Sequence, residues 1–379
     1  MKEKIIFYAF SSQSWDSYFP IIKEILAQEP NAKNWMSVCA PCDRYEFRNE
    51  TSKDLFEFLK GKFRKPREDT LRNPNEYEYA LVTTHIPDES HGLNNGLYIH
   101  VPHGSAFGNN MVSDYLLSCY KASNIYCGVS PTEGEYITNS IGEIARKEAL
   151  FIATGCPKND IFSDYISGSQ EKRHQIKYEI KQAMNISSDK AVVFIASHWT
   201  SRGILRRFGT SLIQALSTLG DKVHIIQGAH PNLWTNHVST QTSEWIYRSL
   251  CHERDRGAAS LSLGVSDASA LLASDIVIGD ISSIVIEAAL LEKPLLLNIN
   301  KDSFRNNQLY EIYKNISVQF EGADDLMQAF MNGVEFPSNR DNMLKQVRDL
   351  FGYNIGNASK QVAKIILNAA SNVKSTSSA

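Results

Sequence analysis

The segment SDIVIGDISSIVIEAALLEKPLLLNI, residues 274–299, decides the fold class of this chain. A short apolar run rich in Val and Ile, typical of a buried strand, ends at Gly279 and Asp280. The next residues have helical apolar spacing and begin at Ser282 and Ser283, and a second apolar run, PLLLNI, follows them. A strand, a helix and a second strand in this order are the unit of a parallel α/β sheet.

The same alternation extends outward along the 379 residues in two series. Strand-like runs of the first series are KIIFYAF, NWMSVCA, EYALVTT, GLYIHVP, NIYCGVS and ALFIATG. A polar, charged stretch separates them from AVVFIAS, KVHIIQGA, SDIVIGD, PLLLNI and NISVQF. We therefore predict an α/β fold of two Rossmann-like domains whose parallel sheets face a central cleft. The domains are expected over residues 1–165 and 166–340, and helices with a polar tail over residues 341–379.

Composition excludes several classes of protein. With 39 Lys and Arg against 42 Asp and Glu, the formal charge is −3, so a general nucleic-acid coat is not expected. The six Cys are scattered and fit a reducing cytoplasm rather than a disulfide framework. No run approaches the roughly 18 apolar residues that cross a bilayer. A cytoplasmic protein is predicted, with membrane contact only as a peripheral association at the inner face.

Two serines open the helix after residue 280. Unpaired N–H groups and the positive dipole end at a helix N-terminus favour an anion, so Ser282 and Ser283 are candidate phosphate ligands. The alternative is that these serines only cap the helix. Glu287, one turn further, is placed to reach a nucleotide ribose, and Asp280 ends the preceding strand. A solvated helix Glu is the alternative for Glu287.

Two histidines follow strands at their predicted carboxyl ends, where open α/β sheets bind ligands. His230 is followed by Pro231, and His103 by Gly104, which allows backbone to approach a ligand closely. A histidine in such a place can bind a diphosphate or act as a base, because its ordinary pKa lies near neutrality. Structural histidines are the more frequent kind, so each one alone is a weak indication.

Further polar residues follow two other strands. The segment GCPKND, residues 155–160, places Lys158 and Asn159 at the end of the first series. The strand AVVFIAS ends at Ser197 and is followed shortly by Trp199. Both sets suit ligand contact, although Gly and Pro in the first set can be turn residues alone.

Taken together and in order, these five segments resemble the CDP-glycerol glycerophosphotransferase family of teichoic-acid glycerol phosphate primases and polymerases. The resemblance covers roughly residues 98–300. It rests on the His-Gly at 103–104, the block at 155–160, the Trp block at 196–199, the His-Pro at 230–231 and the Ser-Ser block at 280–283. The sequence departs from the family where Ile281 replaces a Tyr and where the Arg expected after Trp199 is displaced to Arg202.

The resemblance implies a GT-B fold, with a C-terminal helix crossing back to the first domain. It also implies transfer of a polyol phosphate, glycerol phosphate first, from a CDP-linked donor to a hydroxyl of a cell-surface glycan or lipid-linked acceptor, with release of CMP. No metal and no cofactor are expected. By the resemblance, His103 is the general base, and His230, Ser282 and Ser283 bind the donor pyrophosphate.

Other interpretations stay open at this point. A GT-B glycosyltransferase that uses a nucleotide sugar would share the phosphate site, and so would a sugar-nucleotide epimerase. A non-catalytic nucleotide-binding module is the fourth. The pair Cys39 and Cys42 is interpreted as incidental thiols, and the basic segment 61–69 as a solvated loop or a docking site for the acceptor. Phe56, Phe58 and Phe63 beside it would support an interfacial surface.

Overall fold

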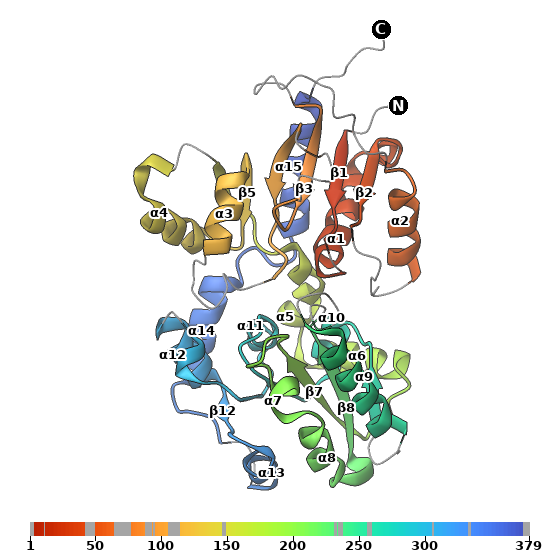
Figure 1. Ribbon diagram of the computed structural model, residues 1–379, viewed down its shortest axis with the longest axis vertical. Helices are drawn as coiled ribbons and strands as arrows, with labels where there is room; N and C mark the ends of the chain where they lie inside the picture. The colour runs from red at the N-terminus through yellow and green to blue at the C-terminus, as the bar shows by residue number, and fades with distance from the viewer. Residues whose placement is uncertain are drawn as a thin grey trace. The chain divides into compact units, whose positions relative to one another are not determined.

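The computed structural model divides into two compact units. It describes residues 4–10, 12–41, 50–63, 77–87, 93, 95–104, 114–145, 149–230, 233, 238–255, 260–304, 307–332 and 335–373. Unit 1 comprises the described residues within Met1–Phe107, Met111–Asp160 and Gly352–Ala379, and unit 2 comprises those within Ile161–Phe351. Figure 1 shows the elements of both units.

Unit 1 is built on a parallel six-stranded sheet with the strand order β2-β1-β3-β4-β5-β6. Its strands are β1 (Ile5–Tyr8), β2 (Met36–Cys39), β3 (Tyr79–Thr83), β4 (Gly96–His100), β5 (Ile125–Gly128) and β6 (Leu150–Ala153). Its helices are α1 (Ser12–Gln28), η1 (Pro30–Asn34), α2 (Glu50–Lys60), α3 (Asp114–Ala122), α4 (Pro131–Ala145) and α15 (Ala358–Asn372). The 3-10 helix η3 (Pro157–Phe162) links it to unit 2.

The core of unit 1 joins the two ends of the chain. All four residues of β1 are buried, as expected of a strand covered on both faces. Helix α15 packs against α1 and β3, and Val362, Ala363 and Ile366 belong to the same buried cluster as Trp15 and Ile22. Figure 1 shows α15 beside β1 and β3. The predicted return of the C-terminal helix to the first domain is confirmed.

Unit 2 is built on a second parallel six-stranded sheet, in the order β12-β11-β10-β7-β8-β9. Its strands are β7 (Ala191–Ser197), β8 (Val223–Ala229), β9 (Ser260–Leu263), β10 (Ile276–Gly279), β11 (Leu295–Leu297) and β12 (Val318–Gln319). Its helices are α5 (Ser163–Ser167), α6 (Gln170–Ala183), α7 (Ile204–Phe208), α8 (Ser211–Ser217), η4 (Gly220–Lys222), α9 (Thr240–Asp255), α10 (Asp267–Ala273), α11 (Ile284–Leu290), η6 (Lys301–Ser303), α12 (Asn307–Ile316), α13 (Ala323–Asn332) and α14 (Arg340–Phe351).

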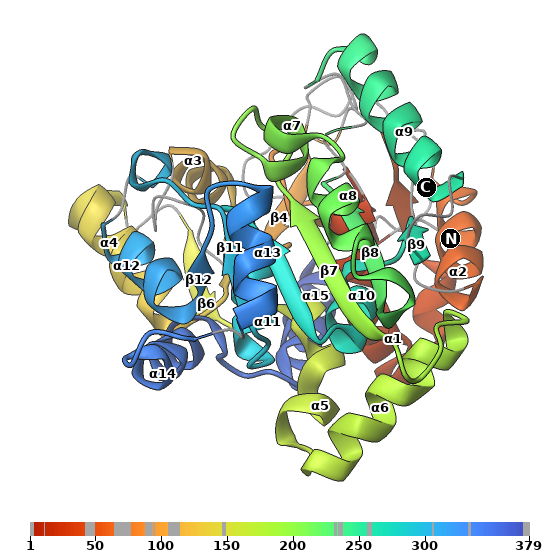
Figure 2. The same cartoon turned by 90° about the horizontal axis from the view of Figure 1, so that it is seen from below.

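Helices of unit 2 surround a sheet whose central strands are largely apolar and buried. Strand β7 is buried along six of its seven residues and lies between β10 and β8. Helix α6 packs on α10, α8 on α13, and α14 on both α11 and α12. Figure 2 shows the strands of this sheet among these helices. The predicted α/β class, with two parallel sheets, is confirmed.

The chain changes unit after Asp160 and again after Phe351, whereas changes after residues 165 and 340 were expected. The first change of unit falls after Asp160, because α5 packs against α6. The chain returns to unit 1 only after Phe351, because α14 packs against α11 and α12 and its Leu344 and Val347 are buried. Thus α14 belongs to unit 2 and α15 to unit 1.

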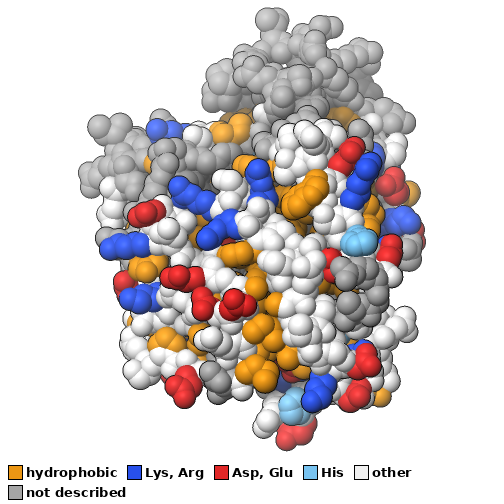
Figure 3. Space-filling model, turned by 60° about the horizontal axis from the view of Figure 1, so that its bottom comes forward, with side chains coloured by type: hydrophobic (Ala, Val, Ile, Leu, Met, Phe, Trp, Pro, Cys, Tyr) orange, Lys and Arg blue, Asp and Glu red, His pale blue; other side chains and the backbone are white. Residues whose placement is uncertain are grey.

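The surface carries both signs of charge. On the face shown in Figure 3, Lys and Arg side chains are interspersed with Asp and Glu side chains. Among the described helices, none is long and apolar enough to cross a bilayer.

Candidate functional site

The carboxyl ends of β3 and β4 bring two histidines together in unit 1. The two strands pair with Thr83 opposite His100, and the N–H of Val101 donates to the carbonyl of Thr83 at 2.8 Å. The loops after these strands therefore leave the sheet side by side. His85 follows one strand and His103 follows the other, and their rings stack with centroids 4.7 Å apart.

A third ring completes this stack. Phe10 follows β1, the next strand of the sheet, and its ring centroid lies 5.0 Å from that of His85. The hydroxyl of Ser17 on α1 donates to the carbonyl of Pro102 at 3.0 Å, which fixes the residue before His103. Three adjacent strands thus each contribute one ring at the same edge of the sheet.

Thr84 contacts both histidines. Its Oγ1 lies 2.7 Å from Nδ1 of His85 and 2.7 Å from the buried Oγ of Ser14. Its backbone carries a hydrogen bond with His103. This contact raises the pKa of His103, which is the effect of a carbonyl that accepts an N–H of the ring.

The surroundings of His103 keep its ring neutral. Burial, and then the neighbouring ammonium of Lys158, lower the pKa of His103 to about 4, and the bond to Thr84 opposes this shift. Burial and His103 lower the pKa of His100 to about 3. Burial, then His103 and His100, also lower the pKa of His85. A neutral His103 that donates one N–H presents a lone pair on its other ring nitrogen.

The block at residues 155–160 holds the start of α15 and places a buried lysine close to His103. Asp160 accepts hydrogen bonds from the N–H groups of Gly356 at 2.6 Å and Ser359 at 2.7 Å, so it holds the start of α15. Gly155 has φ +85°, and a Cβ there would lie 2.5 Å from the carbonyl oxygen of Tyr353. The predicted ligands Lys158 and Asn159 are both buried, and of the two Lys158 is the one that acts on His103.

In unit 2, a buried carboxylate organises the carboxyl ends of β7 and β10. Asp280 follows β10, is fully buried, and accepts from the N–H of His198 at 3.0 Å and from that of Ile204 at 2.9 Å. Burial raises its pKa to about 6, and the N–H donors oppose the shift. Asp280, predicted to bind the donor, therefore anchors the 198–204 loop and the start of α7.

The hydroxyl of Ser197 serves the same loop. It accepts from the N–H of Leu205 at 3.0 Å and donates to the carbonyl of His198 at 3.2 Å. Gly203 in this loop has no room for a side chain, because a Cβ would lie 1.9 Å from the carbonyl oxygen of His198. The 198–204 loop is thus held by the hydrogen bonds of the Ser197 hydroxyl and by the close backbone approach at Gly203.

Three aromatic rings gather where this loop meets the end of β8. The ring centroid of His198 lies 5.4 Å from that of His230 and 5.6 Å from that of Trp199. The N–H of Thr200 donates to Nδ1 of His198 at 3.3 Å, and burial lowers the pKa of this histidine to about 4. A neutral ring whose Nδ1 accepts carries its proton on Nε2, so His198 presents a hydrogen-bond donor.

The Ser-Ser segment begins a short helix beside this group. Oγ of Ser282 accepts from the N–H of Ile284 at 3.3 Å, which is a capping contact. The hydroxyl of Tyr313 on α12 donates to the carbonyl of Ser282 at 3.1 Å. Ser283 precedes α11 and makes no side-chain capping bond. Glu287, predicted to reach a ribose, is fully buried.

The structure thus assembles the predicted residues at two strand edges, one in each unit. Gly104 follows His103 at the first edge, and Pro231 lies outside the described residues. Sequence reasoning missed Thr84 and His85, and it placed His198 only in the polar set that follows β7, without a role of its own. The polar TTH after β3 was the available signal for the first pair, and the same rule of polar residues after strands could have found all three.

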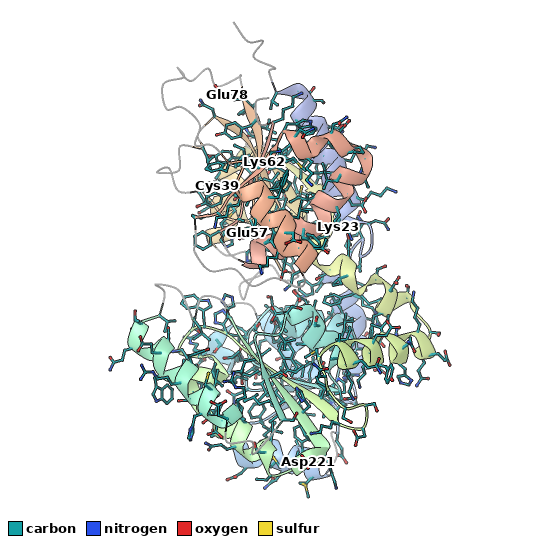
Figure 4. The ribbon with its side chains drawn as sticks, turned by 90° about the vertical axis from the view of Figure 1, so that its right-hand side faces the viewer. Lys23, Cys39, Glu57, Lys62, Glu78 and Asp221 are labelled. Atoms are coloured by element: carbon teal, nitrogen blue, oxygen red, sulfur yellow. The ribbon has the colours of Figure 1, made fainter. Side chains whose placement is uncertain are left out.

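Two discounted features also have a place in the structure. Cys39 ends β2 (Figure 4), and burial raises the pKa of its thiol to about 11, which is the opposite of a reactive cysteine. Cys42 and most of the basic segment 61–69 lie outside the described residues. Of the three phenylalanines beside that segment, Phe56 is buried, Phe63 packs on a buried cluster, and Phe58 is 44% exposed.

Comparison with known proteins decides the family. A family model described as CDP-Glycerol:Poly(glycerophosphate) glycerophosphotransferase matches residues 121–368, well over half of the chain. The chain belongs to this glycerophosphotransferase family. It is therefore an enzyme of that family, as the motif order predicted. No curated protein sequence matches it significantly.

Solved structures support the fold of this glycerophosphotransferase. The wall teichoic acid polymerase TagF matches with a TM-score of 0.61 at 15% identity, covering 97% of this chain and 89% of TagF. The S. aureus protein MnaA, solved with UDP, matches with a TM-score of 0.57 at 13% identity, covering 99% and 100%. A UDP-GlcNAc 2-epimerase from Neisseria meningitidis matches with a TM-score of 0.51 at 14% identity, covering 97% and 100%. These likenesses establish the predicted GT-B-type fold.

Proposed function

We propose that this glycerophosphotransferase moves glycerol phosphate from CDP-glycerol to a hydroxyl of a cell-surface glycan or lipid-linked acceptor and releases CMP. The observation that carries the proposal is the position of His103 after β4, with its ring stacked on that of His85 at the edge of the sheet. The His103 ring is neutral and donates one N–H to the Thr84 carbonyl, so its second nitrogen is ready to accept a proton. The activity is assigned to the cytoplasm, with the acceptor at the inner face of the membrane.

In the proposed step, the acceptor oxygen attacks the phosphorus that carries glycerol. A new phosphorus–oxygen bond forms, the bond from that phosphorus to the bridging diphosphate oxygen breaks, and CMP leaves with that oxygen. The proton of the acceptor hydroxyl passes to His103. The product is a phosphodiester, and His103 returns its proton to solvent before the next turnover.

Unit 2 supplies the proposed donor site. Nε2–H of His198 is a hydrogen-bond donor that suits a diphosphate oxygen, and the ring of His230 lies close to it. Ser282 and Ser283 lie after β10, the strand next to β7, and add hydroxyl groups. Trp199 offers a ring beside both histidines. We assign Glu287 to the nucleoside side of the same site.

Phosphoryl transfer needs alignment and charge stabilisation more than covalent chemistry from the protein. Lys158 supplies a buried positive charge close to the base. Such a charge disfavours protonation of His103 in the resting enzyme, and it favours an anion bound near both groups. Asn159 next to it is assigned to the same donor contact.

The first test is the nucleotide that the protein binds. A ligand that binds only the native state raises the melting temperature by mass action. We would measure melting temperatures with CMP, CDP, CDP-glycerol, CDP-ribitol, UDP, UDP-GlcNAc and GDP. The Ser282→Ala/Ser283→Ala variant is the test variant. Ser371→Ala is the matched control, because Ser371 is exposed on α15 in unit 1.

Selective stabilisation by cytidine compounds, weakened in the double variant and kept in the control, would support the proposal. Selective stabilisation by uridine compounds would overturn it. The product would then separate the two rivals. A UDP-sugar consumed without any acceptor indicates an epimerase, and a glycosidic bond to an acceptor indicates a glycosyltransferase.

A further inference from the structure

The ring of His85 lies between two other rings. Its centroid is 5.0 Å from that of Phe10 and 4.7 Å from that of His103, with interplanar angles of 32° and 25°. These rings follow β1, β3 and β4, which are neighbours in the sheet. One face of the His103 ring is therefore covered by His85.

His85 is itself held at both its backbone and its ring. Its N–H donates to Oγ1 of Thr83 at 3.0 Å, and the Thr83 hydroxyl donates back to the His85 carbonyl. Its Nδ1 lies 2.7 Å from Oγ1 of Thr84, which bonds the buried Oγ of Ser14 on α1. A hydroxyl chain thus connects the ring of His85 to the first turn of α1.

We propose that His85 is a positioning residue for His103. Its ring, held between Phe10 and His103 and bonded to Thr84, keeps the His103 imidazole in the orientation in which its N–H meets the Thr84 carbonyl. This inference rests on the proposed role of His103 as the base. It adds a residue that lies outside the five sequence blocks on which the resemblance rests.

One residue, Thr84, restrains the rings of both His85 and His103. A histidine turns about two side-chain bonds, and a carbonyl contact restrains the ring at one nitrogen only. Stacking restrains the plane of the ring. Thr84 offers its carbonyl to His103 and its hydroxyl to His85, so the two restraints share one anchor.

The same packing governs how the base titrates. Among the residues that the structure describes, the titratable groups that face His103 are His85 from the loop after β3, His100 at the end of β4 and Lys158 on η3. None of them carries a negative charge. Removal of the His85 ring would admit water to one face of His103, which favours its charged form.

The test compares His85→Ala with His85→Phe, which keeps a flat ring without nitrogens. Kinetics of glycerophosphate release from CDP-glycerol would be measured from pH 4 to 8. For His85→Ala we expect kcat to fall about tenfold with KM for the donor nearly unchanged, and the acid limb of kcat/KM to rise by about one pH unit. His85→Phe keeps the stacked ring and loses the bond to Thr84. We therefore expect a rate within about threefold of wild type and an acid limb that shifts in the same direction as for His85→Ala but less.

Several outcomes would overturn the inference. A His85→Ala enzyme with wild-type kcat and acid limb would do so. A His85→Phe enzyme as impaired as His85→Ala would also do so, because the stacked ring would then contribute nothing. His103→Ala separates the two proposals. Full activity in His103→Ala overturns the base and the inference together, whereas an inactive His103→Ala with an unchanged His85→Ala overturns the inference alone.

A second variant guards against misfolding of His85→Ala. Ser14→Ala removes the last hydroxyl of the chain and leaves all three rings in place. We expect a shift of the acid limb in the same direction as for His85→Ala but smaller. A wild-type limb in Ser14→Ala, together with unaltered melting, would contradict the inference.

Discussion

The two strand edges hold their loops in different ways. In unit 1, the loops after β3 and β4 are held by stacked rings and by neutral hydrogen bonds through Thr84 and Ser14. In unit 2, one buried carboxylate, Asp280, accepts the N–H groups of both His198 and Ile204. The first arrangement spreads its restraint over many weak contacts, and the second concentrates it in one group.

This difference indicates what each edge needs. A proton acceptor requires a defined orientation and a neutral ring, and stacked rings with hydroxyl groups fix the orientation without adding charge of their own. A site for a phosphorylated ligand requires backbone and side-chain donors that stay in place, and a buried anion can hold several N–H groups at once. We therefore expect substitutions at the first edge to change catalysis and substitutions at Asp280 to change folding.

The largest effect is expected at His103. His103→Ala removes the proposed proton acceptor, and general base catalysis contributes about 100-fold to 10,000-fold. We expect kcat/KM for glycerophosphate transfer to fall by about 1,000-fold with an unchanged melting temperature. His174→Ala, at an exposed position of α6, is the control and keeps the wild-type rate. A fall of less than tenfold in His103→Ala would rule against a base at this position.

The next effect is on stability. Asp280→Ala leaves the N–H groups of His198 and Ile204 buried without their acceptor, at about 1–3 kcal/mol for each group. We expect the free energy of unfolding in urea to fall by about 2–4 kcal/mol. Asp221 provides the matched control, because it is fully exposed at the end of unit 2 (Figure 4) and its removal should leave the midpoint unchanged. Equal midpoints for both variants would refute the anchoring role of Asp280.

A smaller effect is expected at His198. His198→Ala removes a hydrogen-bond donor from the proposed phosphate site, which should weaken CDP-glycerol binding by about tenfold. Thr200→Val keeps the backbone N–H that donates to Nδ1 of His198 and removes only the hydroxyl, so a much smaller change is expected. Calorimetric titration of both variants measures the difference. Unchanged affinity in His198→Ala would mean that its Nε2–H faces no ligand.

The smallest effect is expected for pH, because activity should change little between pH 8 and 5. The base form of His103 is the neutral ring, and its pKa is lowered to about 4. Activity should therefore vary less than about twofold from pH 8 down to 5, and fall as the pH drops through about 4 instead of 6.5. An acid limb near 6.5 would show that His103 titrates as an exposed histidine.

Folding itself changes over the same pH range, so each rate needs a melting control. The unfolded chain protonates its histidines near pH 6.5, whereas folded His103, His100 and His198 resist protonation. The unfolded state then binds more protons, and stability falls as the pH drops below about 6.5. Melting temperatures at each pH separate this loss from loss of the base.

Much of the fold could be predicted from the sequence, because buried parallel strands are continuous apolar runs. The runs at β1, β7 and β10 are of this kind. Strand β9 was not predicted. Its sequence SLSL alternates hydroxyl and apolar residues and it pairs only with β8 at the edge of the sheet, so no continuous run marks it.

The candidate site could be predicted only where a residue follows its own strand. His103 and His230 were found in this way. The partnership of Phe10 with His85 depends on β1 lying beside β3 in the sheet, and no local pattern gives that order. The contact of Asp160 with Ser359 likewise joins segments that are distant in sequence.

The return of α15 to unit 1 sets the order in which the protein can be completed during synthesis. Ribosomes deliver the chain from its N-terminus, and α15 supplies Val362 and Ile366 to the core that contains β1. The strands of unit 1 are therefore synthesised first, but their core is complete only after α15 has been synthesised. All residues of unit 2 are synthesised between these two steps. Asp160 and Gly155 contact the segment that begins α15, so they form part of the surface on which this helix packs. A chain released before residue 352 would contain all of unit 2 but would lack α15 of unit 1, and the apolar core of unit 1 would then be exposed to chaperones.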